Sequence, residues 1–451
     1  MAFLQTVIAF LLALGILISV HEYGHFWVAR RLGVKILRFS LGFGQPLYRR
    51  QLGETEFTVS AIPLGGYVKM LDEREGEVAQ HELHRAFNRQ PLSTRVAVVV
   101  AGPLANFVLA FAAYWLTLVI GVSAPVALIG EVEKNSIADR AGLQADDRIT
   151  SIGGIQTATW DGVFRKSLEG ILDNRVVPVT VENHAGASRH AELDFSGMSI
   201  DDISEGDFLA ELGIAPRRPL IPPRIKRVVE GEAAAMGGLR AGDLVTEAGG
   251  ISVTSWSEWV EIIRNHAGRS LMVTVARDSE TLELEITPKS SEVDGEVIGR
   301  IGAEVEVPAD FDPLPRAVER YGPLEAIPAA LGRTRDMSVT TLKFLGKMIT
   351  GQASVQNLSG PISIAHYAGQ SAQLGLARFL EFLALVSVSL AVLNLLPIPL
   401  LDGGHLLYYL IEFATRKPVS ETVQIYGQHI GLVMLLSLMG LAVYNDILRI
   451  L

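Results

Sequence analysis

Four long apolar segments constrain the fold of this chain more than any other feature of its sequence. They run from Phe3 to about Ala29, from Val96 to about Val122, from about Phe379 to Leu400, and from about Ile425 to Leu448. Each supplies the roughly 20 apolar residues that a helix needs to cross about 30 Å of hydrocarbon. Only 20% of the residues are charged, against about 25% in soluble proteins, which argues against a single soluble domain. We therefore expect four membrane-spanning helices; a buried core helix is the alternative, chiefly for the fourth segment.

Basic residues set the expected orientation of these spans. Eleven Lys and Arg residues lie between residues 21 and 95, and Arg416 and Lys417 lie between the third and fourth spans. Short loops rich in Lys and Arg stay in the cytoplasm, so both termini and the long segment 123–375 are expected outside. No Lys or Arg precedes Arg30, so the first span is expected to be retained rather than cleaved as a signal peptide.

Composition excludes several other classes of protein. The chain has no cysteine, which excludes a disulfide scaffold, a thiolate zinc site and a cysteine nucleophile. Its net charge is -10 and no long basic stretch is present, so no nucleic-acid partner is expected.

An internal repeat fills part of the outer segment. Residues 138–160 match residues 234–256 at a constant offset of 96, with 10 identities in 23 positions. We interpret this as a tandem duplication. The run Gly-Leu-Arg-Ala-Gly-Asp-Leu-Val at 238–245 resembles bacterial PDZ domains, α+β modules that bind extended peptides at a sheet edge. The first copy has Asp146 where the second has Gly242. One or both copies could instead serve only to block access or to act as a spacer.

The run His21-Glu22-Tyr23-Gly24-His25 is the strongest local signal. On a helix, His21 and His25 lie one turn apart and project from one face, which suits two ligands of one zinc ion. Glu22 could then act as a general base toward a metal-bound water. The two histidines lie about 7–14 Å inside the membrane when depth is counted from Arg30 at about 1.5 Å per residue. Ionisable residues at that depth are usually functional, although a pair of satisfied polar histidines is the alternative.

A catalytic zinc with two histidine ligands needs a third protein ligand. Asp402 follows the third span in Asn394-Leu-Leu-Pro397-Ile-Pro399-Leu-Leu-Asp402-Gly-Gly, and His405 is a rival. The two prolines interrupt the helix, and a broken backbone at membrane depth is tolerated where it lines a cavity.

Together these residues resemble the site-2 proteases, a family of intramembrane zinc metalloproteases. The resemblance covers nearly the whole chain and includes the His-Glu-x-x-His motif, the Asn-x-x-Pro-x-Pro-x-x-Asp-Gly motif and the repeated PDZ-like units. It implies one Zn²⁺ per chain bound by His21, His25 and Asp402, with Glu22 as the general base. It favours Asp402 over His405.

The resemblance also implies substrate contacts. Asn394, with Pro397 and Pro399, would contact the unwound backbone of the substrate. Residues 62–70, which include Gly65, Gly66 and Tyr67, resemble a membrane-associated β segment of the family. On their own, residues 55–70 predict a short strand that ends in a glycine turn, either an edge for an extended substrate or a plain hairpin. Asn106 is a polar residue in the second span and could support the zinc site or join helices.

The expected fold class is a polytopic α-helical membrane protein with four transmembrane helices, a membrane-associated β segment and two inserted α+β PDZ domains. The helix pair with the zinc motif should occupy residues 1–122. The remaining expected boundaries are 123–219 and 220–308 for the two PDZ domains, 309–375 for amphipathic helices on the membrane surface, and 376–451 for the last two spans.

The function implied by the resemblance is hydrolysis of peptide bonds within or near transmembrane segments. The implied substrates are membrane proteins, namely an anti-sigma factor and remnant signal peptides, and the PDZ pair would exclude untrimmed substrates or bind a peptide ligand. The implied location is a bacterial inner membrane, with the termini and PDZ domains periplasmic, the active site toward the cytoplasm, and lipid as a further partner. Two alternatives are a membrane PDZ scaffold with an inactive metal site and a metal transporter.

Overall fold

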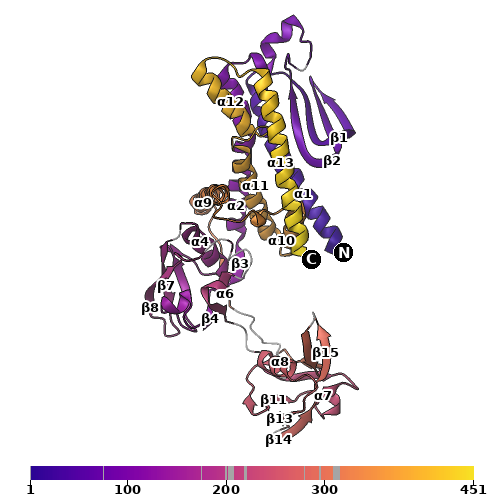
Figure 1. Ribbon diagram of the computed structural model, residues 1–451, viewed down its shortest axis with the longest axis vertical. Coiled ribbons are helices and arrows are strands. Elements are labelled where there is room, and N and C mark those ends of the chain that lie inside the picture. Colours follow the sequence, from indigo (N-terminus) through magenta and orange to yellow (C-terminus); the bar gives the residue numbers. More distant parts are fainter. Residues whose placement is uncertain are drawn as a thin grey trace.

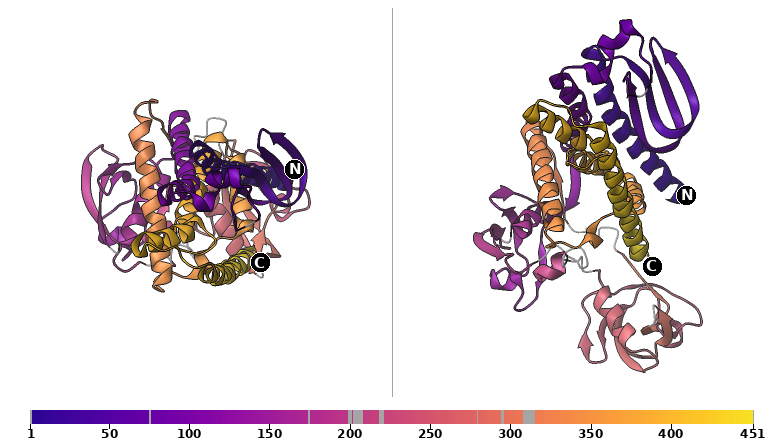
Figure 2. Two further views of the ribbon diagram at one scale, coloured as in Figure 1. Left: turned by 90° about the horizontal axis from the view of Figure 1, so that it is seen from above. Right: turned by 45° about the horizontal axis from the view of Figure 1, so that its top comes forward.

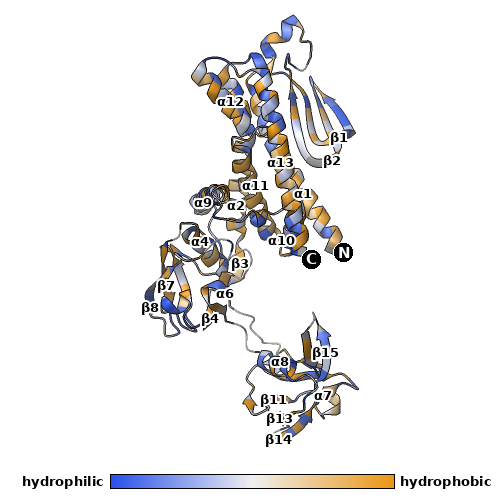
Figure 3. Cartoon of the chain, in the orientation of Figure 1, coloured by the Kyte–Doolittle hydropathy of each residue, from blue (hydrophilic) through white to orange (hydrophobic). Residues whose placement is uncertain are grey.

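The structure, a computed structural model, describes residues 2–74, 76–173, 175–198, 201, 208–217, 221–278, 280–293, 296–307 and 315–450. Within these residues, four helices are long and apolar enough to cross a membrane. Their bounds are α1 Ala2–Arg31, α2 Leu92–Ile120, α11 Leu376–Asn394 and α13 Glu421–Ile450. They form the upper part of the molecule in Figure 1 and are largely hydrophobic in Figure 3. The structure therefore confirms four helices that are candidates for membrane spans.

The third span ends earlier than expected. We expected it to continue to Leu400, but α11 ends at Asn394 and a second helix, α12 Asp402–Thr415, begins after a seven-residue break. Pro397 and Pro399 lie in this break, where their missing N–H groups and fixed φ angles prevent a continuous helix. The break therefore places Asp402 in the first turn of a new helix.

Small residues bring α1 and α2 into close contact. A Cβ atom added at Gly24 would lie 2.3 Å from the carbonyl oxygen of Ala101 and 2.8 Å from the Cβ of Ala105. Close approach through small residues is the usual way in which membrane helices pack. Gly24 therefore brings the helix of the His-Glu motif directly against α2.

The segment between α1 and α2 forms a long, curled antiparallel hairpin. Its strands are β1 Ile36–Leu52 and β2 Thr55–Met70, and β2 folds around β1 so that Phe39 pairs with both Phe57 and Val68. The glycine turn expected at the end of residues 55–70 is wrong: the strand bends at Gly65 (φ 138°) and continues to Met70. Two short 3-10 helices, η1 Gln80–Arg85 and η2 Phe87–Arg89, lead on to α2.

The repeated sequence forms two units with the same strand order. The first contains β4 Ile129–Val132, α3 Ile137–Arg140, β5 Arg148–Ile152, β6 Ile155–Gln156, α4 Trp160–Leu172, β7 Val176–Glu182, β8 Ser188–Asp194, α6 Phe208–Leu212 and β9 Ile214–Pro216. The second contains β10 Ile225–Val228, α7 Ala233–Met236, β11 Leu244–Ala248, β12 Ile251–Ser252, α8 Trp256–Asn265, β13 Leu271–Arg277, β14 Glu280–Ile286, β15 Lys289–Val293, β16 Glu296–Arg300 and β17 Ala303–Val305. The four-stranded sheets run β6-β5-β7-β8 and β12-β11-β13-β14. The first unit adds the pair β4 with β9, and the second adds the matching pair β10 with β17 and a further hairpin, β15 with β16.

The departure of the first copy at Asp146 leaves the backbone unchanged. Asp146 has φ 66° and Gly242, its counterpart, has φ 92°, so both adopt the left-handed region. Aspartate tolerates that region better than most residues, which accounts for the substitution. The expected boundaries 219/220 and 308/309 lie outside, or at the edge of, the described residues.

The segment before the third span contains a strand as well as the expected helices. Strand β18 Arg316–Glu319 pairs with β3 Val122–Pro125, which follows α2, and the helices α9 Ala326–Ile349 and α10 Pro361–Gln373 come next, joined through η3 Val355–Asn357. Figure 1 shows α9 end-on, whereas Figure 2, turned by 90°, shows it along its length. Helix α9 therefore lies across the membrane-spanning helices rather than along them.

Both ends of α13 are fastened to the rest of the chain. Near its C-terminus, buried Asp446 accepts hydrogen bonds from the backbone N–H groups of Gly360, Ile362 and Ser363 at 2.9–3.0 Å, and so caps α10. Nearer its N-terminus, a Cβ atom added at Gly431 would lie 2.2 Å from the carbonyl oxygen of Pro399. The last helix therefore packs against the loop that precedes Asp402.

Candidate metal centre

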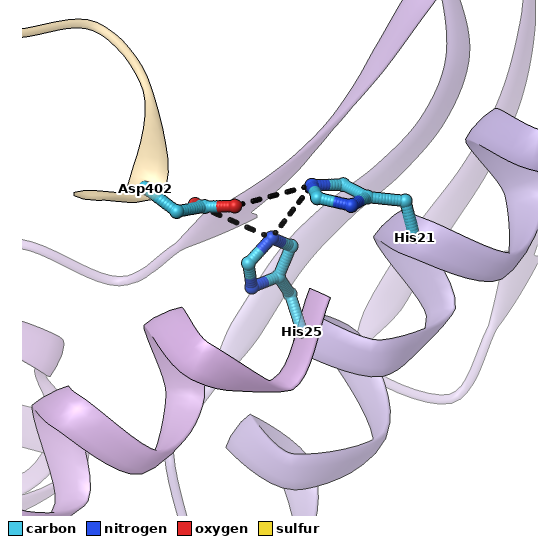
Figure 4. A group of neighbouring side chains, drawn as sticks. All are labelled: His21, His25 and Asp402. Atoms are coloured by element: carbon cyan, nitrogen blue, oxygen red, sulfur yellow. Dashed lines mark hydrogen bonds and ion pairs between the residues drawn. The ribbon is translucent and has the colours of Figure 1, made fainter. Parts of the chain in front are cut away.

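The structure brings His21, His25 and Asp402 together. The histidines project from neighbouring turns of α1, and Asp402 enters from the start of α12, as Figure 4 shows. The Nε2 atom of His21 lies 3.2 Å from Nε2 of His25 and 3.3 Å from Oδ2 of Asp402, and Nε2 of His25 lies 3.5 Å from Oδ1 of Asp402. The side chains are only 11–16% exposed.

These separations fit a zinc ion. Ligand atoms placed about 2.0–2.1 Å from one tetrahedral zinc lie about 3.3 Å from each other, close to the three distances observed. In addition, Oδ2 of Asp402 is buried without a hydrogen-bond partner. A buried carboxylate oxygen is costly to leave unpaired, and a bound cation removes that cost.

Helix α2 orients the ring of His25. Nδ1 of His25 lies 2.8 Å from the carbonyl oxygen of Val98, which can only accept a hydrogen bond, so Nδ1 carries the proton and donates it. The lone pair of Nε2 is then directed at the other two ligand atoms. A histidine that binds a metal usually has this kind of support on its second nitrogen.

The same helix leaves room for His25. A Cβ atom added at Gly102 would lie 2.2 Å from Nε2 of His25, so no larger residue fits there without displacing the ring. Neither Gly102 nor Val98 is among the site residues that the sequence predicts. Gly102 could have been found because it lies in a stretch of small and polar residues within an apolar span. The carbonyl of Val98 could not, because every residue has a backbone carbonyl.

The loop before Asp402 is tightly built. Leu400 has φ 83°, a conformation that bulky residues rarely adopt. Cβ atoms added at Gly403 and Gly404 would lie 2.0 Å and 2.5 Å from the carbonyl oxygens of Leu396 and Ile398. The two glycines therefore allow α12 to begin directly over the loop, which fixes the position of Asp402.

Glu22 lies beside this cluster, close to β2. It is near enough to His21, His25 and Asp402 to interact electrostatically with all three. A Cβ atom added at Gly66 would lie 2.8 Å from Cγ of Glu22, so β2 passes directly over this side chain. The carboxylate and the strand are therefore neighbours at the centre.

The other expected site residues take different positions. Tyr67 is turned toward β1, where its ring stacks on Phe43 and its hydroxyl accepts a hydrogen bond from Arg38. Gly65 also packs on Phe43. Asn394 ends α11, and Pro397 and Pro399 lie in the loop that leads to Asp402, with Pro399 against α13.

Among the described residues, the one group of His, Asp and Glu ligand atoms close enough to hold a metal consists of His21, His25 and Asp402. His405, the rival ligand, lies outside this group, and its ring is edge-on to that of Tyr408.

An ion pair joins the helix of Asp402 to α2. Arg95 of α2 forms a bidentate ion pair with Glu412 of α12, at 2.5 and 3.0 Å.

Comparisons with known proteins agree with this centre. The family model "Peptidase family M50" matches residues 9–438. The chain is 42% identical over 455 residues to the regulator of sigma-E protease RseP of Escherichia coli K12, covering 100% of both chains. It is 41% identical over 450 residues to a Neisseria meningitidis protein whose name classes it among zinc metalloproteases, covering 99% of this chain and 100% of that one.

A solved PDZ domain of an SdrC-like protein from Listeria monocytogenes is also similar, at 23% identity over 19% of this chain and 87% of that chain, with a TM-score of 0.17. The family match and the full-length relatives favour a protease over the two alternatives, a membrane PDZ scaffold and a metal transporter. The chain belongs to peptidase family M50, the site-2 proteases, and is an intramembrane zinc metalloprotease.

Proposed function

We propose that His21, His25 and Asp402 bind the catalytic zinc and that Glu22 is the general base. The observation that carries this proposal is the convergence of three side chains, whose ring nitrogens and carboxylate oxygens lie 3.2–3.5 Å apart, with one carboxylate oxygen otherwise unpaired. Zinc held by these residues would polarise the scissile carbonyl and lower the pKa of a bound water toward neutrality. Glu22 is placed to accept a proton from the attacking water and to deliver it to the leaving amine.

The substrate lies extended between β2 and the broken third span. A helical substrate hides its carbonyls in internal hydrogen bonds, so it must unwind before attack. Gly65, Gly66 and Tyr67 belong to the part of β2 that passes over Glu22, and a strand edge there can pair with an extended peptide. Asn394, Pro397 and Pro399 precede Asp402 in the break after α11. In this proposal they contact the unwound backbone of the substrate.

The assignment of the zinc ligands is tested by zinc content. We expect His21→Ala and Asp402→Ala to lose the one zinc per chain, because each leaves only two protein ligands. His405→Ala is the matched control, since His405 also lies in the first turns of α12 but outside the cluster. Metal analysis of the purified full-length proteins gives the result. Zinc retained by Asp402→Ala and lost by His405→Ala would overturn the assignment.

The centre faces the cytoplasm of a bacterial inner membrane, and the termini and repeat units are periplasmic. Figure 1 supports this arrangement because both termini lie at the end of the membrane helices that is next to the first unit. The hairpin and α12 lie toward the other end, which carries the Lys- and Arg-rich connections.

The two repeat units are PDZ domains that select substrates by size. An ion-pair network fixes the first unit on the membrane domain: Arg378 contacts Asp161 at 2.5 Å, and Arg165 contacts Glu381 and Glu319 at 3.3 and 3.5 Å. Two further pairs, Lys166 with Asp336 and Lys343 with Asp173, join α4 to α9. A unit held in this way can exclude substrates with bulky outer domains.

Size selection predicts a gain of function. Asp161→Arg places a cation against Arg378, so we expect the first unit to loosen and untrimmed membrane substrates to be cleaved severalfold faster. Ser257→Arg is the control, because Ser257 is exposed and occupies the same place in the second copy. Cleavage rates are compared for one substrate with and without a folded outer domain. Equal discrimination by both variants would contradict the proposal.

The second unit has an open groove for a peptide ligand. Trp256, Trp259 and Val260 of α8 line it together with residues 298–303, and its volume is about 590 Å³. In the first unit the counterpart of Val260 is Phe164, whose ring packs on Phe208 at 5.2 Å. We expect Val260→Phe to weaken tryptophan-detected binding of a peptide with a free C-terminus; unchanged binding would place the ligand elsewhere.

The physiological substrates are membrane proteins already trimmed outside, namely an anti-sigma factor and remnant signal peptides. The name of the Escherichia coli relative, a regulator of sigma-E protease, supports the first of these.

A further inference from the structure

Asn106 contacts the zinc centre from the middle of α2. It is fully buried, and its amide nitrogen lies 3.2 Å from Nδ1 of His21, the ring nitrogen that faces away from Asp402. Its amide oxygen is buried without a hydrogen-bond partner. A fully buried amide with one unpaired atom calls for an explanation from its neighbours.

The tautomer of His21 supplies that explanation. A neutral imidazole that binds a metal through Nε2 carries its proton on Nδ1 and needs an acceptor there. The amide nitrogen of Asn106 is a donor, so in this orientation two donors would face each other. The oxygen and nitrogen of an amide exchange places by a half-turn of the group, and their assignment follows from the hydrogen-bond network.

We propose that Asn106 is the positioning residue of His21, with Oδ1 accepting the Nδ1–H of His21 whenever Nε2 binds zinc. This inference rests on the zinc ligands proposed above. The opposite orientation, in which the amide nitrogen donates to Nδ1, suits the metal-free tautomer that carries its proton on Nε2. An amide serves both states because it is both donor and acceptor.

Helix α2 then orients both zinc histidines. The carbonyl of Val98 accepts from Nδ1 of His25, and the amide of Asn106 faces Nδ1 of His21 at 3.2 Å. In the proposed orientation, Oδ1 of that amide accepts from His21. Joining helices does not require that amide, because α2 and α11 pack through a shared apolar cluster, and at this level the hydrogen bond between them uses the Asn106 backbone: its carbonyl accepts a 2.8 Å hydrogen bond from buried Ser387. The side chain is therefore free to serve the centre.

The test is the zinc affinity of the full-length protein in detergent, measured by competition with a chelator. We expect Asn106→Leu, which keeps the volume but removes the acceptor, to bind zinc about 10–100-fold more weakly. Asn106→Asp retains an acceptor and should bind about as tightly as wild type. Ser387→Ala is the matched control, since it removes the hydrogen bond from α11 to the Asn106 backbone without touching the amide, and its zinc affinity should be unchanged.

One further measurement and one further variant separate the possible results. The visible spectrum of the Co²⁺-substituted protein should change in Asn106→Leu, because a freed His21 ring alters the ligand geometry, and should be preserved in Asn106→Asp. If Asn106→Leu does not fold, Asn106→Ala repeats the comparison without added bulk. Zinc retained by His21→Ala would overturn the ligand set itself. Zinc lost by His21→Ala but held normally by Asn106→Leu would overturn only the role of Asn106, as would equal losses in Asn106→Leu and Ser387→Ala.

Discussion

Replacement of Glu22 by glutamine should reduce cleavage of a single-span membrane substrate by at least about 10²-fold, the usual contribution of a general base. Glutamine keeps the size of the side chain and its place beneath β2, where Gly66 approaches Cγ, but it cannot accept the proton of an attacking water. His21, His25 and Asp402 are unchanged, so the variant should still contain one zinc per chain. Cleavage rate and zinc content of the purified protein are measured together.

The shorter acid Glu22→Asp is the matched comparison. It retains a carboxylate but withdraws it by one methylene, so we expect an intermediate rate. Loss of zinc from Glu22→Gln would assign the residue to metal binding instead. Equal cleavage by Glu22→Gln and wild type would remove Glu22 from the mechanism and indicate a contaminating protease.

The chemistry of the centre could be predicted from the sequence because helix geometry is local. The spacing of His21 and His25 fixes both on one face of α1, and the flanking apolar residues fix their depth in the membrane. Asp402 is different, since 377 residues separate it from His25. No local rule pairs these positions, and the expectation rested on resemblance to a family.

Other parts of the site could not be predicted because they depend on tertiary contacts. Every residue has a backbone carbonyl, so the identity of Val98 does not indicate a hydrogen bond. Only the packing of α2 on α1 reveals that this carbonyl accepts from His25. The curl of the hairpin likewise depends on β2 pairing with both sides of β1, which alternation within one strand does not encode. The ion pairs between α4 and the membrane domain join residues more than 150 positions apart.

Replacement of Gly102 by alanine should weaken zinc binding strongly, although it changes neither a proposed zinc ligand nor the proposed base. In Gly102→Ala the new methyl carbon would lie 2.2 Å from Nε2 of His25, whereas non-bonded heavy atoms normally stay about 3.5 Å apart. The ring would have to move by about 1 Å, yet Nδ1 is held by Val98, one turn earlier on the same helix. Zinc–nitrogen distances tolerate only about 0.2 Å, so we expect zinc affinity to fall at least about tenfold, and cleavage with it.

Gly15→Ala is the control for this substitution. It makes the same chemical change in a membrane helix, but a Cβ atom at Gly15 meets nothing within 4 Å. Alanine also favours a helix over glycine, so Gly15→Ala should leave zinc affinity and cleavage unchanged and the fold at least as stable. Thermal unfolding of both variants shows whether Gly102→Ala acts through the centre or through the fold. Normal zinc affinity in Gly102→Ala would show that α2 does not confine His25, and therefore that this helix does not orient the zinc ligands.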